Sequence, residues 1–416
     1  MTKKILTLII LMVCLMVNEK VSAEIVSVRG IAEVYGDGEK VSTAIVEYPK
    51  NLSAQIKAKD FQVDGKIIDS VEVNGKFVTL KFRYENTAFD GELSKKPNRP
   101  KKDKPMGDAP MRSDRKLPEL NFTVKQVNEI FAIDGTKFSP DEKVCKNISA
   151  PIIEKFQQFV YVDSETGLSM PYNLYLPEGY DANKKYPLMF FVADASANIN
   201  EITTPMFQGN GATIWATAEE QAKHPCIILA PQYTADLVDK IGMMTTDENV
   251  WTQGLSLVTN LLFDVIKNYS VDKTKIYGAG QSQGGMANIA ISDKYPELFA
   301  AQMLVACQWN VAEMEILKDK NLWIVVCEGD TKAFPTMNKS VERWKNLGAK
   351  VATNSNFWNS KSSISELDAQ VKKLASQGAN INYTVFKGGN HMYTWSFAYN
   401  IDAIRDWIFS KSLEVY

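Results

Sequence analysis

The sequence of 416 residues contains only two histidines, His224 and His391, and none of its five cysteines forms a C-x-x-C motif. Without such clustered ligands the sequence predicts no zinc site, and chemistry that needs a histidine has only two candidates. The formal net charge is −2, which gives no general reason to expect nucleic-acid binding. Hydrophobic residues make up 45% and charged residues 23%, so we expect an ordinary globular protein with a sizeable core.

Long hydrophobic runs are also missing, apart from one near the N-terminus. Residues 5–17 form an apolar run of 13 residues, shorter than the roughly 20 that a membrane span needs. Two lysines precede this run, and small residues end at Ala23. This pattern is typical of a secretory signal peptide, with an uncleaved anchor as the alternative. We therefore predict that residues 1–23 are removed and that the mature protein is secreted or periplasmic, without stable membrane insertion.

Four cysteines remain after cleavage: Cys145, Cys226, Cys307 and Cys327. Export permits disulfides in more than one pairing. Three of the four lie in or just after apolar, strand-like runs, which favours plain buried thiols for at least two of them.

Tryptophan is absent between residues 24 and 140, where short alternating segments are separated by glycine-containing turns. The segments predict strands over residues 24–30, 42–49, 54–63, 66–73 and 77–84, followed by a closing strand or hairpin over 121–135. No segment has a helical period. About six or seven strands in this space predict an immunoglobulin-like β-sandwich that lacks the tryptophan and disulfide of antibody domains.

A basic, proline-rich segment interrupts this predicted sandwich. Residues 94–116 contain nine basic residues, three acids and four prolines. Such a segment cannot build a core, so we predict a solvated loop, with an arm that binds anions or polysaccharides as the alternative. Residues 141–150 are predicted to be a linker.

From residue 151 to 416, apolar runs alternate with helical segments. The expected strands are 187–194, 226–233, 275–280, 299–307, 322–330 and 381–389. The expected helices are 214–224, 250–269, 284–295 and 336–348. Strands that are apolar on both faces are typical of a covered parallel sheet. The pattern therefore predicts an α/β domain with one mostly parallel central sheet flanked by helices.

A serine motif lies between one of these strands and the helix that follows. Residues 280–284 read "GQSQG", which fits G-x-S-x-G, and the strand–turn–helix context is the one that this motif requires. Ser282 is therefore the candidate nucleophile. The backbone N–H of Gln283, at the start of the helix, is placed to donate to an oxyanion.

Serine needs a base, and the base needs an acid that orients it. His391 lies in a polar loop after the last expected strand, whereas His224 lies before a strand and is interpreted as a surface residue. Asp330 follows the strand between the serine and the histidine, and Glu328 is its close competitor. We favour Asp330 because it lies farther out in the loop. The order serine, acid, histidine is the one expected for this architecture.

With these residues in place, residues 151–416 resemble the α/β-hydrolases. They are most similar to secreted esterases of the polyhydroxybutyrate-depolymerase and feruloyl-esterase type and to the neighbouring "predicted peptidase" group, some of which carry an N-terminal immunoglobulin-like domain. The matching stretches are "MPYNLYLPEGYDANKKYPLMFFV", "IILAPQY", "YSVDKTKIYGAGQSQGGMA", "YPELFAAQMLVACQW" and "GGNHMYTW". The resemblance implies Ser282 as nucleophile, His391 as base, Asp330 as acid and Gln283 as one oxyanion donor.

The sequence departs from this family at one turn. Where the family has His-Gly after the strand at 187–194, this chain has Ala193 and Asp194. The resemblance implies that this turn supplies the second oxyanion N–H, here that of Ala195. An acidic side chain that pointed at the oxyanion would oppose catalysis.

Two further features bear on the substrate. Trp309 is expected either to line the substrate pocket or to pack in the core. Residues 352–380 are longer than a minimal connection and are expected to form a lid or rim carrying Phe357 and Trp358, or an additional surface helix.

Together these observations predict a serine carboxylesterase without a cofactor or metal. Its substrate is a small or polysaccharide-linked ester, with plant cell-wall esters suggested by the resemblance. The N-terminal domain is expected to bind carbohydrate, form a homo-oligomer or cover the active site. A serine peptidase for short peptides, and a degenerate hydrolase that binds glycans or a cell surface, are the alternatives.

Overall fold

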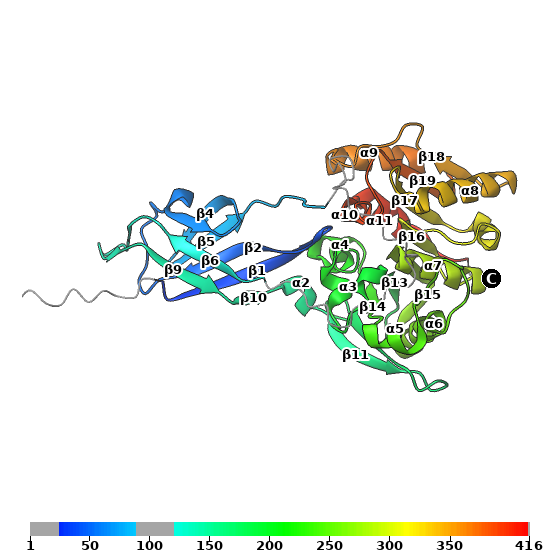
Figure 1. Ribbon diagram of the computed structural model, residues 1–416, viewed down its shortest axis with the longest axis horizontal. Coiled ribbons are helices and arrows are strands. Elements are labelled where there is room, and N and C mark those ends of the chain that lie inside the picture. Colours follow the sequence, from blue (N-terminus) through cyan, green and yellow to red (C-terminus); the bar gives the residue numbers. More distant parts are fainter. Residues whose placement is uncertain (1–24, 89–119, 415–416) are drawn as a thin grey trace, which may run out of the picture. The chain divides into compact units, whose positions relative to one another are not determined.

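A computed structural model describes residues 25–88 and 120–414 of the chain (Figure 1). The predicted signal peptide and the whole basic segment at 94–116 lie outside the described residues. The described chain divides into two compact units, one formed by residues 25–32, 41–84 and 120–149. The other is formed mainly by residues 150–414, together with 33–40 and 85–88.

The first unit is built from strands. Its larger sheet has the order β10-β1-β2-β5-β4, and β3-β6-β9 and β7-β8 form two smaller sheets. The strands are β1 (Ser27–Tyr35), β2 (Gly38–Glu47), β3 (Phe61–Val63), β4 (Ile68–Asn74), β5 (Phe77–Phe82), β6 (Phe122–Gln126), β7 (Ile130–Phe131), β8 (Lys137–Phe138), β9 (Asp141–Cys145) and β10 (Asn147–Ser149). Alternate residues of the longer strands point into a shared core that includes Val46, Val78, Leu80 and Val124.

Two segments of this unit differ from the prediction. Residues 54–63 were expected to be one strand, but only Phe61–Val63 is a strand, preceded by a short 3₁₀ turn at Ala58–Asp60. Asp60 caps that turn by accepting from the backbone N–H of Lys57. Residues 141–150 were expected to be a linker, but β9 pairs with β6 and β10 pairs with β1. The polar and charged residues of 141–149 obscure the strand pattern because most of them face solvent.

The second unit contains one nine-stranded sheet with the order β11-β12-β14-β13-β15-β16-β17-β19-β18. Its strands are β11 (Gln157–Val162), β12 (Ser169–Tyr175), β13 (Tyr186–Val192), β14 (Ile227–Pro231), β15 (Val271–Gln281), β16 (Ala301–Val305), β17 (Leu322–Cys327), β18 (Val351–Thr353) and β19 (Ile381–Phe386). The strands from β14 to β18 pair in parallel, as expected. β11 and β12 were not expected; they add an antiparallel edge.

Helices cover both faces of this sheet (Figure 1). They are α2 (Pro151–Glu154), α3 (Thr204–Phe207), α4 (Ala218–Lys223), α5 (Ala235–Ile241), α6 (Gln253–Asn268), α7 (Gln283–Lys294), α8 (Ala333–Asn346), α9 (Ile364–Ala375), α10 (Trp395–Ala398) and α11 (Asp402–Phe409). Leu188, Phe190 and Val192 of β13 pack in one core with residues of α6, α7 and α8. The residues between them, Met189 and Phe191, pack in a second core with α9, α10 and α11. This alternation explains why nearly every strand residue is apolar.

The part of the chain in residues 25–88 and 120–414 has no helix long and apolar enough to cross a membrane. Its four cysteines, Cys145, Cys226, Cys307 and Cys327, are all buried and unpaired. Burial raises the pKa of Cys327 to about 12 and also raises the pKa values of Cys226 and Cys307.

These four thiols should not react with a thiol reagent in the native protein, because they are inaccessible and because only the thiolate is nucleophilic. All four should be labelled within minutes after unfolding in guanidinium chloride. Peptide mapping after iodoacetamide treatment, with and without denaturant, measures this. Labelling of any of the four in the folded protein, or a disulfide between two of them, would contradict the expectation.

One buried carboxyl group stands out near the C-terminal end of α7. Neither oxygen of Asp293 has a hydrogen-bond partner within the described part of the chain. Burial, assisted by the charge of Glu313, raises the pKa of Asp293 to about 7. The negative end of the helix dipole also disfavours a carboxylate at this position.

Between pH 4 and 7 the native state therefore holds a proton at Asp293 that the unfolded state releases, and stability falls as pH rises through this window. We expect Asp293→Asn to be more stable than the parent protein at pH 8, by about 1–3 kcal/mol. The difference should shrink towards pH 4. Urea unfolding at the two pH values measures it, with the exposed Asp239→Asn as control. An equal effect of Asp293→Asn at both values would refute the assignment.

Candidate active site

The candidate functional residues follow parallel strands of one part of the sheet. β13, β15, β16, β17 and β19 are consecutive in the sheet, so their carboxyl ends meet at one edge. Ligands and catalytic groups of open α/β sheets gather at this edge. Asp194 follows β13, Ser282 follows β15, Asp330 follows β17 and His391 follows β19.

Ser282 occupies the sharp bend between β15 and α7. Its backbone angles are φ 50° and ψ −119°, in a region that residues other than glycine rarely adopt. The bend is fixed on both sides, because the Ser282 N–H donates to the carbonyl of Val305 and its carbonyl accepts from the N–H of Met286. Such stored strain is common where a side chain must be presented to a substrate. The Ser282 side chain does not cap α7, which leaves its hydroxyl available.

Both glycines of the motif are required by close contacts. A side chain at Gly280 would lie 2.5 Å from the backbone of Gly284. A side chain at Gly284 would lie 1.9 Å from the carbonyl oxygen of Val192, at the end of β13. The spacing G-x-S-x-G thus lets the bend close on itself and lets α7 begin directly against the neighbouring strand.

His391 connects the serine to a carboxylate. Its Nε2 lies 2.8 Å from Ser282 Oγ, and its Nδ1 lies 2.7 Å from Asp330 Oδ2. With Asp330 ionised, the carboxylate only accepts, so Nδ1 carries the proton and Nε2 accepts from the serine hydroxyl. The imidazole side chain is 34% exposed, which leaves room for a substrate beside it. The ring packs against Trp395 in a T-shaped arrangement, with 5.3 Å between centroids.

Asp330 is held in place by the start of α8. Its side chain is only 1% exposed, and Oδ1 accepts from the backbone N–H groups of Lys332 and Ala333. These bonds to backbone N–H groups at the start of the helix hold the carboxylate in a fixed position. The competitor Glu328 is exposed and accepts from the backbone N–H of Gly388. The hydrogen bond from His391 therefore goes to Asp330.

The two expected oxyanion donors lie on adjacent segments. Gln283 is the first residue of α7, and Ala195 begins a 3₁₀ turn at Ala195–Ala197 that directly follows β13. Asp194, the residue that departs from the family pattern, is buried and caps this turn. Its Oδ1 accepts from the Ser196 N–H and the Gln208 side chain, and its Oδ2 accepts from the side chain of Gln281.

Sequence reasoning did not find the polar partners of this turn. Gln281, Gln208 and Asn198 are separated along the chain and form no motif, and Gln283 was expected to act only through its backbone. The one available signal was that both neighbours of Ser282 are glutamines.

The structure places Trp309 in a hydrophobic core and forms an additional helix within the 352–380 segment. Trp309 is buried in a hydrophobic core, and its indole N–H donates to Glu313. A contact of Trp309 with substrate stays a prediction. Residues 364–375 form α9, whose apolar face packs in the core with α11. Phe357 is partly exposed and packs edge-on against Phe334.

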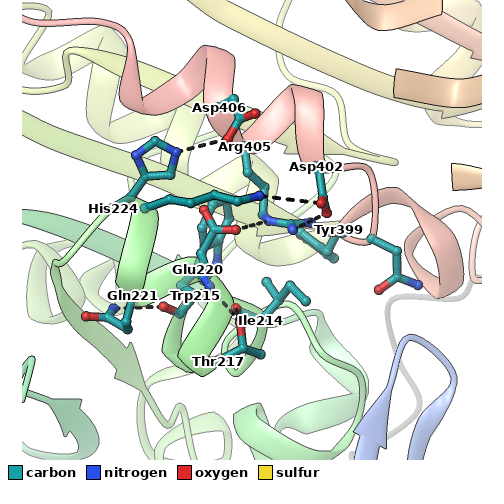
Figure 2. Close-up of polar contacts among 12 residues, drawn as sticks. Ile214, Trp215, Thr217, Glu220, Gln221, His224, Tyr399, Asp402, Arg405 and Asp406 are labelled. Carbon is teal, nitrogen blue, oxygen red and sulfur yellow. Dashed lines mark hydrogen bonds and ion pairs between the residues drawn. The ribbon is translucent and has the colours of Figure 1, made fainter. Parts of the chain in front are cut away.

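The second histidine belongs to a different cluster, which joins α4 to α11 (Figure 2). His224 Nε2 lies 3.0 Å from Asp406 Oδ1, and the ring stacks on Phe409. It was expected to be a simple surface residue, but it is half-buried and paired. The buried ion pair between Arg405 and Glu220 lies beside it. No serine lies next to the histidine in this cluster, so we interpret the cluster as a structural contact between α4 and α11.

Comparison with protein families agrees with this arrangement. Residues 164–405, more than half of the chain, match the family described as "Putative esterase". The chain belongs to this esterase family. Residues 27–139 match the family described as "Esterase Ig-like N-terminal domain". The protein is thus an ester hydrolase with an α/β-hydrolase fold and a preceding immunoglobulin-like domain, as its sequence predicted.

Among solved structures, a thermostable esterase is similar to this chain, with a TM-score of 0.70 and 24% identity. The match covers 93% of this chain and 100% of that one, and it shows a shared fold. A feruloyl esterase module from Clostridium thermocellum in complex with sinapinate gives a TM-score of 0.43 and 15% identity, covering 63% and 91% of the two chains. A likeness at that score supports no inference. No curated protein is significantly similar to the esterase.

The two candidate acids, Asp330 and Glu328, can be distinguished by replacing each of them in turn with its amide. Asp330→Asn should lower kcat for ester hydrolysis by about 10⁴-fold, because the amide disturbs the tautomer of His391. Glu328→Gln removes the neighbouring carboxylate but leaves the His391 contact intact, so its kcat should stay within about threefold of the parent enzyme. Steady-state kinetics on one p-nitrophenyl ester measures both. A larger loss in Glu328→Gln than in Asp330→Asn would show that the acid is Glu328.

Proposed function

We propose that this esterase hydrolyses carboxylic esters through Ser282 as nucleophile, His391 as base and Asp330 as acid. The observation that carries the proposal is the continuous hydrogen-bonded series from Ser282 Oγ through His391 to the buried Asp330. These contacts have the geometry that an activated serine requires.

In the first step, Ser282 Oγ attacks the ester carbonyl carbon while its proton moves to His391 Nε2. The carbonyl oxygen becomes an oxyanion, which accepts hydrogen bonds from the backbone N–H groups of Gln283 and Ala195. Each such donor typically contributes about 10²–10³ in rate. Asp330 stabilises the imidazolium that forms.

Collapse of this intermediate breaks the bond to the alcohol oxygen, which takes the proton from His391, and leaves an acyl-enzyme. In the second step, a water gives a proton to His391 Nε2 and attacks the acyl carbon. The same two N–H groups stabilise the second oxyanion. Its collapse releases the carboxylic acid and returns the proton to Ser282 Oγ.

The departure at Ala193 and Asp194 was the main support for a degenerate, ligand-binding hydrolase. Both carboxylate oxygens of Asp194 are occupied by donors from Ser196, Gln208 and Gln281. A carboxylate that is bound in this way has its charge compensated within the turn. This arrangement favours a working enzyme over a degenerate one.

Several finer features belong to the same proposal. Residues 1–23 are a cleaved signal peptide, which makes the esterase secreted or periplasmic. The resemblance of its sequence to feruloyl and polyhydroxybutyrate esterases suggests acyl esters on plant polysaccharides as substrates. The domain boundary is placed between the immunoglobulin-like residues 24–140 and the catalytic residues 151–416, and β9 and β10 belong with the former.

An ester panel tests the catalytic proposal. Ser282→Ala should lower kcat at least about 10⁴-fold on acetyl, feruloyl and longer acyl esters, because it removes the nucleophile. Ser292→Ala removes a buried hydroxyl from the same helix, so its activity should stay close to that of the parent enzyme. A fluorophosphonate probe should label the parent enzyme at Ser282, and aminoacyl anilides in the same panel test the peptidase alternative. Undiminished ester hydrolysis by Ser282→Ala would end the proposal.

A further inference from the structure

The two glutamines beside Ser282 reach the same neighbouring segment. Gln281 ends β15 and Gln283 begins α7, and both side chains are buried. Buried amides need partners, since an unpaired one costs about 1–3 kcal/mol. For both residues, the partner side chain lies in residues 194–198, the turn after β13 that contains Ala195.

Gln283 and Asn198 form a reciprocal amide pair. Gln283 Nε2 donates to Asn198 Oδ1 at 3.1 Å, and Asn198 Nδ2 donates to Gln283 Oε1 at 3.2 Å. Both residues are buried, so water does not compete for these bonds. Two bonds between planar groups restrict both the distance and the relative orientation of the segments that carry them.

Gln281 fixes the other end of the same turn. Its Nε2 donates to Asp194 Oδ2 at 3.1 Å, and the other Asp194 oxygen accepts from the Ser196 N–H. The carboxylate therefore bridges the nucleophile segment and the backbone of the turn. Ala195 lies between Asp194 and Asn198, the two residues that the glutamines contact.

We propose that Gln281 and Gln283 are positioning residues that align the two halves of the oxyanion hole. Their side chains hold the 194–198 turn against the Ser282 segment, so that the N–H groups of Ala195 and Gln283 both donate to the oxyanion of the substrate. The inference rests on the proposed function, in which those two N–H groups bind the oxyanion. Asp194, which replaces the usual glycine, is then a bridging acceptor for Gln281.

The central test uses Gln283→Met, which keeps the length of the side chain and removes its amide. A misaligned donor loses part of its contribution, so kcat should fall about 10- to 100-fold while KM stays within about twofold. The affinity for a boronic acid that forms a tetrahedral adduct with serine should fall by a similar factor. Gln302→Met is the matched control, because Gln302 is also buried and bonds to Asn288 and Ser292 of α7, away from the 194–198 turn. Its kcat should not change.

A double variant separates positioning from stability. Gln283→Met alone leaves Asn198 unpaired, whereas Gln283→Met with Asn198→Leu replaces both amides by apolar groups. The double variant should recover the unfolding midpoint of the parent enzyme, and its kcat should remain low. Recovery of kcat together with stability would overturn the proposal, as would a kcat of Gln283→Met within twofold of the parent enzyme or equal to that of Gln302→Met.

Gln281→Met tests the second contact and gives the same comparison if Gln283→Met does not fold. The Ser282→Ala variant distinguishes failure of the proposed function from failure of the positioning role of the two glutamines. If Ser282→Ala remains active, the proposed function fails whatever the glutamine variants do. If Ser282→Ala is inactive and both glutamine variants match the parent enzyme, only the positioning role fails.

Discussion

The close approach of α7 to the end of β13 is the contact on which the site depends. Gly284 lies so near the carbonyl of Val192 that even a methyl group has no space there. This contact brings the first turn of α7, with the N–H of Gln283, beside the turn that contains Ala195. It also requires the strained backbone of Ser282, because the chain must reverse from strand to helix within one residue. The parallel sheet supplies the rigidity that maintains this strain.

Two buried carboxylates, each with its own hydrogen-bond donors, lie on either side of this contact. On one side, Asp330 is buried against the start of α8 and orients His391. On the other, Asp194 is buried against the 3₁₀ turn and is bridged to Gln281. Both carboxylates are compensated by backbone N–H groups, which is the ordinary condition for a buried charge. Asp330 faces the histidine, and Asp194 stabilises the backbone of the turn that contains Ala195.

Features held by residues close together in the sequence were predicted, whereas features held by residues far apart in the sequence were missed. The serine bend was predictable because strand, glycines and helix are contiguous in residues 275–295. The strands β11 and β12 were missed because β12 pairs with β14, more than fifty positions away in the chain, and β11 joins the sheet through β12. The strands at 141–149 were missed because their exposed polar and charged side chains hide the alternation. The α/β-hydrolase fold and the immunoglobulin-like domain, by contrast, followed from periodicity and resemblance together.

The sequence by itself determined the fold class, the esterase family and the candidate nucleophile and base, since Ser282 and His391 each follow a strand in the expected order. It favoured Asp330 over Glu328 only by position in the loop, because alternation points both side chains in one direction. The loop geometry of the structure turns Asp330 towards His391. It also left open how Asp194 is accommodated in this turn. The tertiary structure decided that, because the amides of Gln281 and Gln283 meet Asp194 and Asn198 only after β13 and β15 pair side by side.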